Sequence, residues 1–142
     1  MEIVAAARLL DEAGGPFVIR VAGHAGDALR AMLARFEAAG AVVTGTPNDT
    51  AGLHIEMGPV ELAVRCFDPL TLTVQRAEMN EAGTRILFRV MASLGRSAGA
   101  EVTLAAVDRP EAPIFRYRPG GPGLDHVATG EVVAPYRADD DA

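Results

Sequence analysis

The sequence predicts an α+β fold, a two-layer sandwich in which two amphipathic helices cover one face of an antiparallel sheet of four to six strands. Residues 53–57, 60–66 and 70–75 alternate apolar and polar side chains, which is typical of strands buried on one side only. Residues 27–40 and 79–94 instead repeat apolar side chains at helical spacing. The predicted order is therefore strand, helix, four strands and helix.

The first part of the chain begins with an apolar segment, residues 3–10, that suits either a short helix or a strand. Residues 17–21 are rich in β-branched side chains and predict a strand. A helix is expected to begin near Asp27 and to end at Gly40. Its apolar stripe consists of Leu29, Met32, Leu33 and Phe36.

A short strand at residues 41–44 leads through a polar loop into the three alternating strands. The second helix is predicted over residues 79–94, with a break at 93–99 and a last strand at 102–107. Its buried face consists of Ile86, Leu87, Val90, Met91 and Leu94.

Composition divides the chain into a single α+β domain at residues 1–107, with its core at 16–107, and a C-terminal arm or linker at 108–142. The second segment contains five prolines and four glycines, with 127–133 as a candidate short strand. Its acidic end, residues 139–141, is expected to be disordered.

The formal net charge of -6 argues against a nucleic-acid partner, because phosphate binding needs clustered basic side chains and the 13 here are scattered. All 13 are arginine. The single cysteine cannot form an intramolecular disulfide. Neither a signal peptide nor a transmembrane segment is recognisable, so we expect a cytoplasmic protein with no membrane partner.

The outward residues of the three alternating strands form the candidate binding face. A tight turn at Gly58-Pro59 would place Glu56 opposite Glu61, and like charges in that position need a compensating cation. An arginine or solvent is the favoured answer, and a metal ion held with a nearby histidine is the alternative. The predicted ligand- or partner-binding residues are His54, Glu56, Glu61, Arg65, Thr71, Thr73 and Gln75. We predict no catalytic residue, no metal site and no cofactor.

Two further features have structural and functional interpretations. The turn containing Gly23, His24 and Gly26 leads into a helix and can bind an anion, although Asp27 would compete for the same backbone donors. Cys66 ends the inward series of its strand, so we expect it to be a small buried hydrophobic residue.

The segment Gly58-Pro59-Val60-Glu61-Leu62, followed by the alternating residues 70–74, resembles a bacterial domain family of unknown function. That family occurs beside, or fused to, siderophore-interacting flavin-dependent ferric reductases. The resemblance covers residues 17–94 and implies the strand, helix, strand, hairpin and helix order. Histidines typical of the family near the ends of both helices are replaced here by other residues, at 36–38 and at 93–96.

These observations favour a small non-enzymatic binding or accessory module that uses the open sheet face. The resemblance implies a link to iron or siderophore handling. A protein partner or a second copy is the expected occupant, and a small-molecule ligand is also compatible. The alternatives are an acidic inhibitor that binds a basic surface, and an enzyme whose site is assembled from separate loops.

Overall fold

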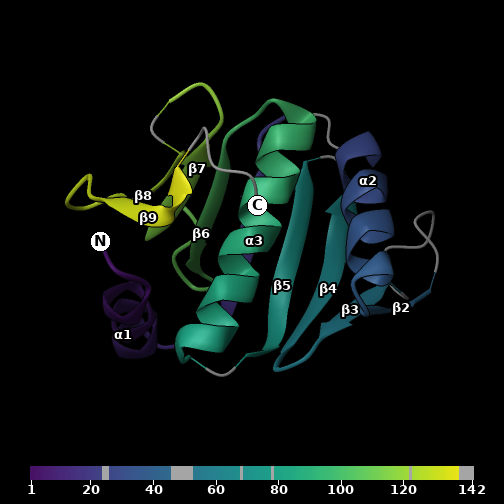
Figure 1. Cartoon of the computed structure of the whole chain (residues 1–142), viewed down its shortest axis with the longest axis horizontal. Helices are drawn as coiled ribbons and strands as arrows, with labels where there is room; N and C mark the ends of the chain where they lie inside the picture. The colour runs from purple at the N-terminus through teal and green to yellow at the C-terminus, as the bar shows by residue number, and fades with distance from the viewer. Residues whose placement is uncertain (24–25, 46–52, 68, 78, 122, 138–142) are drawn as a thin grey trace.

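The computed structural model describes residues 1–23, 26–45, 53–67, 69–77, 79–121 and 123–137 (Figure 1). These residues form three helices and one open antiparallel sheet of nine strands. The helices are α1 (Ile3–Ala13), α2 (Gly26–Ala38) and α3 (Glu81–Ala98). The strands are β1 (Phe17–Val21), β2 (Val42–Thr44), β3 (His54–Met57), β4 (Val60–Phe67), β5 (Leu70–Ala77), β6 (Val102–Ala106), β7 (Phe115–Arg118), β8 (Gly123–His126) and β9 (Val132–Arg137).

The strand order across the sheet is β2-β3-β4-β5-β1-β6-β7-β8-β9. The α+β class and the antiparallel sheet are therefore confirmed. Strand β1 lies near the middle of the sheet, where it pairs with β5 on one side and β6 on the other. Figure 1 shows α2 and α3 on the same side of the sheet, and α1 packs against α3 and β9.

The prediction of four to six strands is wrong, because the segment expected to be an arm contains β7, β8 and β9. Residues 115–118 alternate buried and half-buried side chains, which is a strand pattern. Prolines and glycines on either side of this short run obscured it in the sequence. The buried side chains that these strands add to the core are Phe115, Tyr117, Leu124 and Val133. The predicted disorder of 139–141 concerns residues outside the described ranges.

The ambiguous N-terminal segment is a helix, and α3 extends beyond its predicted end. Asn80 caps α3 by accepting a hydrogen bond from the Gly83 amide at 2.9 Å. The helix continues through the expected break to Ala98, and Gly99 ends it with a positive φ of 61°. Gly95 is tolerated inside this helix because its missing side chain makes room for the Tyr117 ring.

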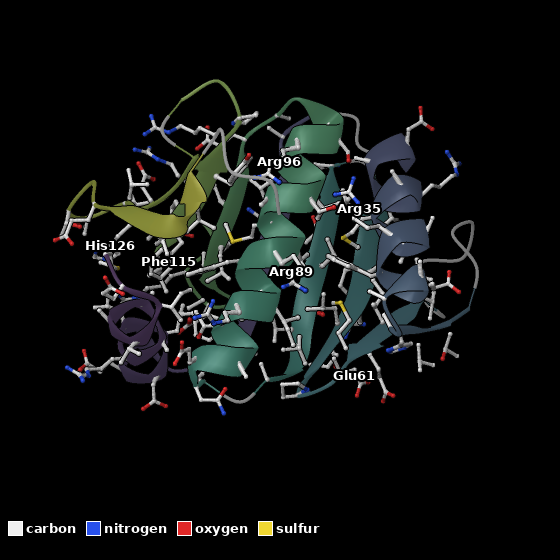
Figure 2. The ribbon with its side chains drawn as sticks, viewed as in Figure 1. Arg35, Glu61, Arg89, Arg96, Phe115 and His126 are labelled. Atoms are coloured by element: carbon white, nitrogen blue, oxygen red, sulfur yellow. The ribbon has the colours of Figure 1, made fainter. Side chains whose placement is uncertain are left out.

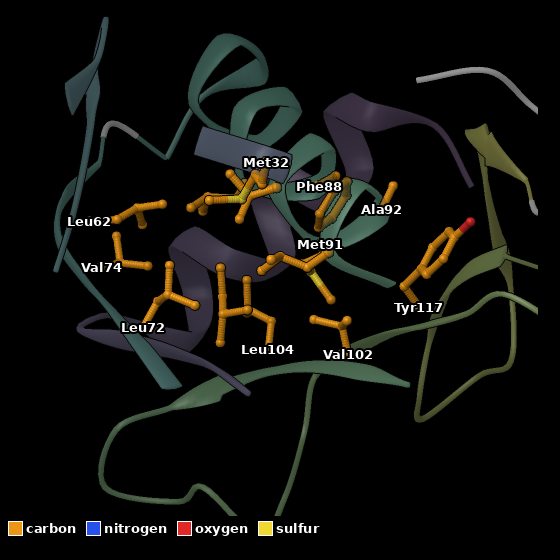
Figure 3. Close-up of a cluster of buried hydrophobic side chains, with 14 of the residues drawn as sticks. Met32, Leu62, Leu72, Val74, Phe88, Met91, Ala92, Val102, Leu104 and Tyr117 are labelled. Carbon is orange, nitrogen blue, oxygen red and sulfur yellow. The ribbon is translucent and has the colours of Figure 1, made fainter. Parts of the chain in front are cut away.

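The core fills the space between the helices and the sheet (Figure 3). Leu72 and Leu104 from the sheet face Met91 and Phe88 from α3, and all four are fully buried. The Phe88 and Phe115 rings pack with their centroids 4.9 Å apart. Tyr117 lies against α3, where its hydroxyl accepts a hydrogen bond from Arg96 Nε at 3.1 Å. The C-terminal strands are thus attached to the same core as the central strands.

The three-strand meander β3-β4-β5 is present, but β4 and β5 contain two irregularities in their pairing. One lies between Val64 and Cys66, so that Arg65 is an extra residue and Cys66 pairs with Thr71. The expectation that Cys66 continues the inward series is therefore wrong. Its side chain is half-buried on the side of Thr71, which alternation with the buried Leu70 and Leu72 directs away from the helices.

Candidate partner-binding face

The face of the sheet opposite the helices carries the predicted binding residues. Its middle row consists of His54, Ala63, Thr73, Val18 and Ala105, which are Cα partners of one another on adjacent strands. The three apolar residues of that row are at most 6% exposed. This open sheet face is therefore polar at its surface and closely packed beneath.

The acidic pair is present in the predicted register. Glu56 and Glu61 are Cα partners on β3 and β4. His54 Nδ1 lies 3.9 Å from Glu61 Oε1, and Arg76 is the Cα partner of Glu61 on β5. The His54 imidazole therefore lies next to the carboxylate pair.

The hydroxyl of Thr73 joins two other predicted residues. It accepts hydrogen bonds from Arg65 Nε at 3.1 Å and from Gln75 Nε2 at 2.7 Å. The Thr71 hydroxyl donates to the Pro69 carbonyl oxygen at 3.1 Å. The structure therefore brings all seven predicted residues onto one face, with the acidic pair towards one end of the strands and Arg65 towards the other.

A row of alternating arginine and threonine crosses this face beside Arg65. Thr71 pairs with Arg20, Arg20 pairs with Thr103, and Thr103 pairs with Arg116. On β4 the Cα partner of Thr71 is Cys66, and Arg65 is the extra residue directly before it. The row therefore contains, in spatial order from β4 to β7, Arg65 (one residue out of register), Thr71, Arg20, Thr103 and Arg116. Because adjacent strands are about 4.8 Å apart, the backbones of Arg20 and Arg116, which lie two strands apart in register, are separated by about 10 Å. We call these five residues the arginine row.

Two arginines of this row lack a described acidic partner. Arg20 and Arg65 are both exposed, and no described carboxylate forms an ion pair with either. Beside Arg20 lies an open groove of about 450 Å³. Its lining consists of Arg20, Val21, Ala22, Pro69, Glu101 and Thr103. The groove holds one acidic residue, Glu101, at its edge.

The far end of the arginine row is anchored by a buried carboxylate. Asp125 on β8 is 1% exposed and accepts hydrogen bonds from Arg116 Nε at 3.2 Å and Arg118 Nη2 at 2.8 Å. Both arginines remain about one third exposed. Two cations around one carboxylate leave a net positive charge at this end, and the pairing fixes the orientation of Arg116.

The sequence could not identify Arg20, Thr103 or Arg116 as part of a binding face. Each is a polar residue within a strand pattern, and that signal was available at least for Arg20 in residues 17–21. Their juxtaposition depends on β1 lying between β5 and β6, which pair with it from distant parts of the chain. No local pattern encodes those neighbours.

The remaining predicted features are less organised. Gly23 has a φ of 73° and Gly26 begins α2, whereas His24 lies outside the described residues. Asp27 forms an ion pair with Arg30 at 2.7 Å rather than a described contact with the turn. Within the described ranges, no three His, Cys, Asp or Glu side chains form a group that could hold a metal ion. Among the described helices, none has both the length and the apolar character needed to cross a bilayer.

Comparisons with family models, curated proteins and solved structures return no match for the chain. The resemblance to the domain family found beside ferric reductases therefore stays a prediction.

Proposed function

We propose that the protein is a non-enzymatic binding module that holds an extended acidic segment of a protein partner across its open sheet face. The observation that carries this proposal is the arginine row. Arginine forms bidentate hydrogen bonds with carboxylates, and the neighbouring Thr103 hydroxyl is a further donor for the same groups, whereas the Thr71 hydroxyl already donates to the Pro69 carbonyl oxygen. Arg20 and Arg65, which have no described acidic partner, would be the main contacts.

The spacing of the row favours a particular conformation of the partner. A polyproline II segment has three residues per turn and rises about 3.1 Å per residue, so side chains three positions apart share one face at about 9.3 Å. This repeat is close to the spacing of about 10 Å between arginines on alternate strands. An acidic residue at every third position would thus meet successive arginines. Glu56 and Glu61 would repel the segment from the other end of the strands.

A direct test measures the binding of a labelled peptide built from Glu-Pro-Ser repeats by fluorescence anisotropy at low ionic strength. An exposed ion pair contributes about 0.2–1 kcal/mol, so losing two should weaken binding by about two- to thirtyfold. We expect that loss in the double variant R20Q/R65Q. The matched control is R8Q/R109Q, which removes two exposed arginines outside the row and should leave the affinity unchanged.

Alkylation of Cys66 tests independently where the peptide binds. Its half-buried thiol pairs in register with Thr71, so a bound segment should slow its alkylation. A peptide with glutamine in place of glutamate should neither bind nor slow the alkylation of Cys66. Full affinity in R20Q/R65Q would contradict the proposal. So would equal binding of a thymidine oligonucleotide with the same number of charges, because that result would indicate attraction to polyanions in general.

The acidic pair supports a second candidate, an acidic inhibitor that binds a basic surface of its partner. The net charge of -6 would steer such an encounter, and Glu56 with Glu61 would provide the contact. A Lys-Pro-Ser peptide separates the two candidates. If the protein is an acidic inhibitor, the Lys-Pro-Ser peptide binds to it, and E56Q/E61Q abolishes that binding without lowering the melting temperature. A link to iron or siderophore handling has only the resemblance to support it.

A further inference from the structure

A small hollow lies on the helix side of the molecule, away from the open sheet face. It has a volume of about 210 Å³ and lies between the C-terminal end of α2, the β3-β4 turn and α3. Its lining consists of Phe36, Ala39, Gly40, Ala41, Met57, Gly58, Ile86 and Arg89. Three consecutive small residues, 39–41, follow the end of α2 at Ala38 and line the hollow together with Phe36.

Apolar side chains and backbone groups share the walls of this hollow. Phe36 is 5% exposed, and Met57 and Ile86 are half-buried hydrophobic residues packed against the core. The volume corresponds to about seven water molecules at roughly 30 Å³ each, which is room for a six-membered ring or a branched alkyl group. An apolar group lying against these side chains would release the water that covers them, which is favourable.

Arg89 is the one charged residue of the lining, and it differs from its neighbours on the helices. Arg30 and Arg85 form ion pairs with acidic residues one turn away. Arg96 donates to Tyr117, and Arg35 lies 3.4 Å from the Ser93 hydroxyl. Arg89 is exposed, and no described side chain forms an ion pair or hydrogen bond with it. Figure 2 shows Arg89 and Arg35 at the surface over the seam between α3 and α2.

We infer that this hollow binds a small carboxylate with an apolar body, such as an aryl-substituted acid. The body would occupy the space between Phe36, Met57 and Ile86, and the carboxylate would pair with the Arg89 guanidinium at the rim. The Arg89 cation beside the apolar side chains of Phe36, Met57 and Ile86 complements one anion on an apolar group. This inference is independent of the proposed function, because the arginine row lies on the opposite face of the sheet.

The test uses 3-phenylpropionate, its neutral amide 3-phenylpropionamide, and acetate, each titrated into the ¹⁵N-labelled full chain. With 3-phenylpropionate we expect saturable NMR shifts at the amides of residues 39–41 and Gly58, at the rim of the hollow. R89Q should weaken the binding of the acid about fivefold, which corresponds to the loss of one exposed charge pair. The affinity for the amide should not change. R8Q, an exposed arginine on α1, is the matched control.

A variant that fills the hollow, A41L, should abolish the shifts for both the acid and the amide while the rest of the spectrum stays native. Acetate, which has no apolar body, should bind far more weakly. Equal affinities for acid and amide in the wild type, or shifts confined to other surfaces, would overturn the inference. Competition by a second copy, seen as probe binding that falls as protein concentration rises, would overturn it as well.

Discussion

The contact between Gly95 and Tyr117 predicts that G95A destabilises the protein, although alanine is the better helix former. A Cβ atom at Gly95 would lie 2.8 Å from Tyr117 Cε1, nearer still to Cδ1, and 3.3 Å from the Ala100 carbonyl oxygen. Real Cβ atoms essentially never approach other atoms as closely as the two Tyr117 ring atoms would be. Tyr117 is fully buried and its hydroxyl is bonded to Arg96, so its ring cannot move without loss.

The magnitude follows from three contributions. Overpacking a close-packed core costs about 1–3 kcal/mol, and losing the Tyr117 hydrogen bond adds about 0.5–1.5 kcal/mol. The gain in helix propensity from glycine to alanine offsets about 1 kcal/mol. The expected net loss of unfolding free energy is therefore about 2 kcal/mol. With a urea dependence of about 2 kcal/mol per molar, the midpoint should fall by about 1 M.

Urea unfolding followed by far-UV circular dichroism measures this shift. The control is G26A, because a Cβ at Gly26 meets nothing within 4 Å and its φ is not in the positive region. In a Y117L background the clash is removed, and G95A should there be neutral or stabilising by up to about 1 kcal/mol. A wild-type midpoint for G95A, or an equal loss in both backgrounds, would refute the reasoning.

Three further perturbations test the C-terminal strands and the helix cap. D125N removes the charge that two arginines share, and we expect a loss of about 1–3 kcal/mol in the same urea assay; a smaller loss than 0.5 kcal/mol would show that the pairing is dispensable. N80A removes the acceptor for the Gly83 amide and should cost about 0.5–2 kcal/mol, whereas N80D should retain most of the stability. Truncation after Val107 removes β7, β8 and β9, and should give a chain without a cooperative thermal transition; a sharp transition would contradict their place in the core.

The sequence predicts what is encoded locally and misses what depends on distant pairing. Alternation and the tight turn were sufficient to place Glu56 opposite Glu61, because a hairpin register is set within a few residues. The same reasoning failed for Cys66, since an extra residue at Arg65 reverses the alternation and leaves no mark in the side-chain pattern. Arg20 could be recognised as outward-facing in its strand, but its neighbours Thr71 and Thr103 could not be known.

The position of β1 has a consequence for how the molecule folds. β2 to β5 and β6 to β9 are two sets of sequential strands that can each form from nearby residues. Val18 instead pairs with Thr73 and Ala105, which lie 55 and 87 residues further along the chain. The hydrogen bonds of β1 therefore form only after β5 and β6, which lie much further along the chain, are available for pairing. Such long loop closures slow folding, and we expect the β1 amides to become protected from hydrogen exchange only when the whole sheet closes in one cooperative step.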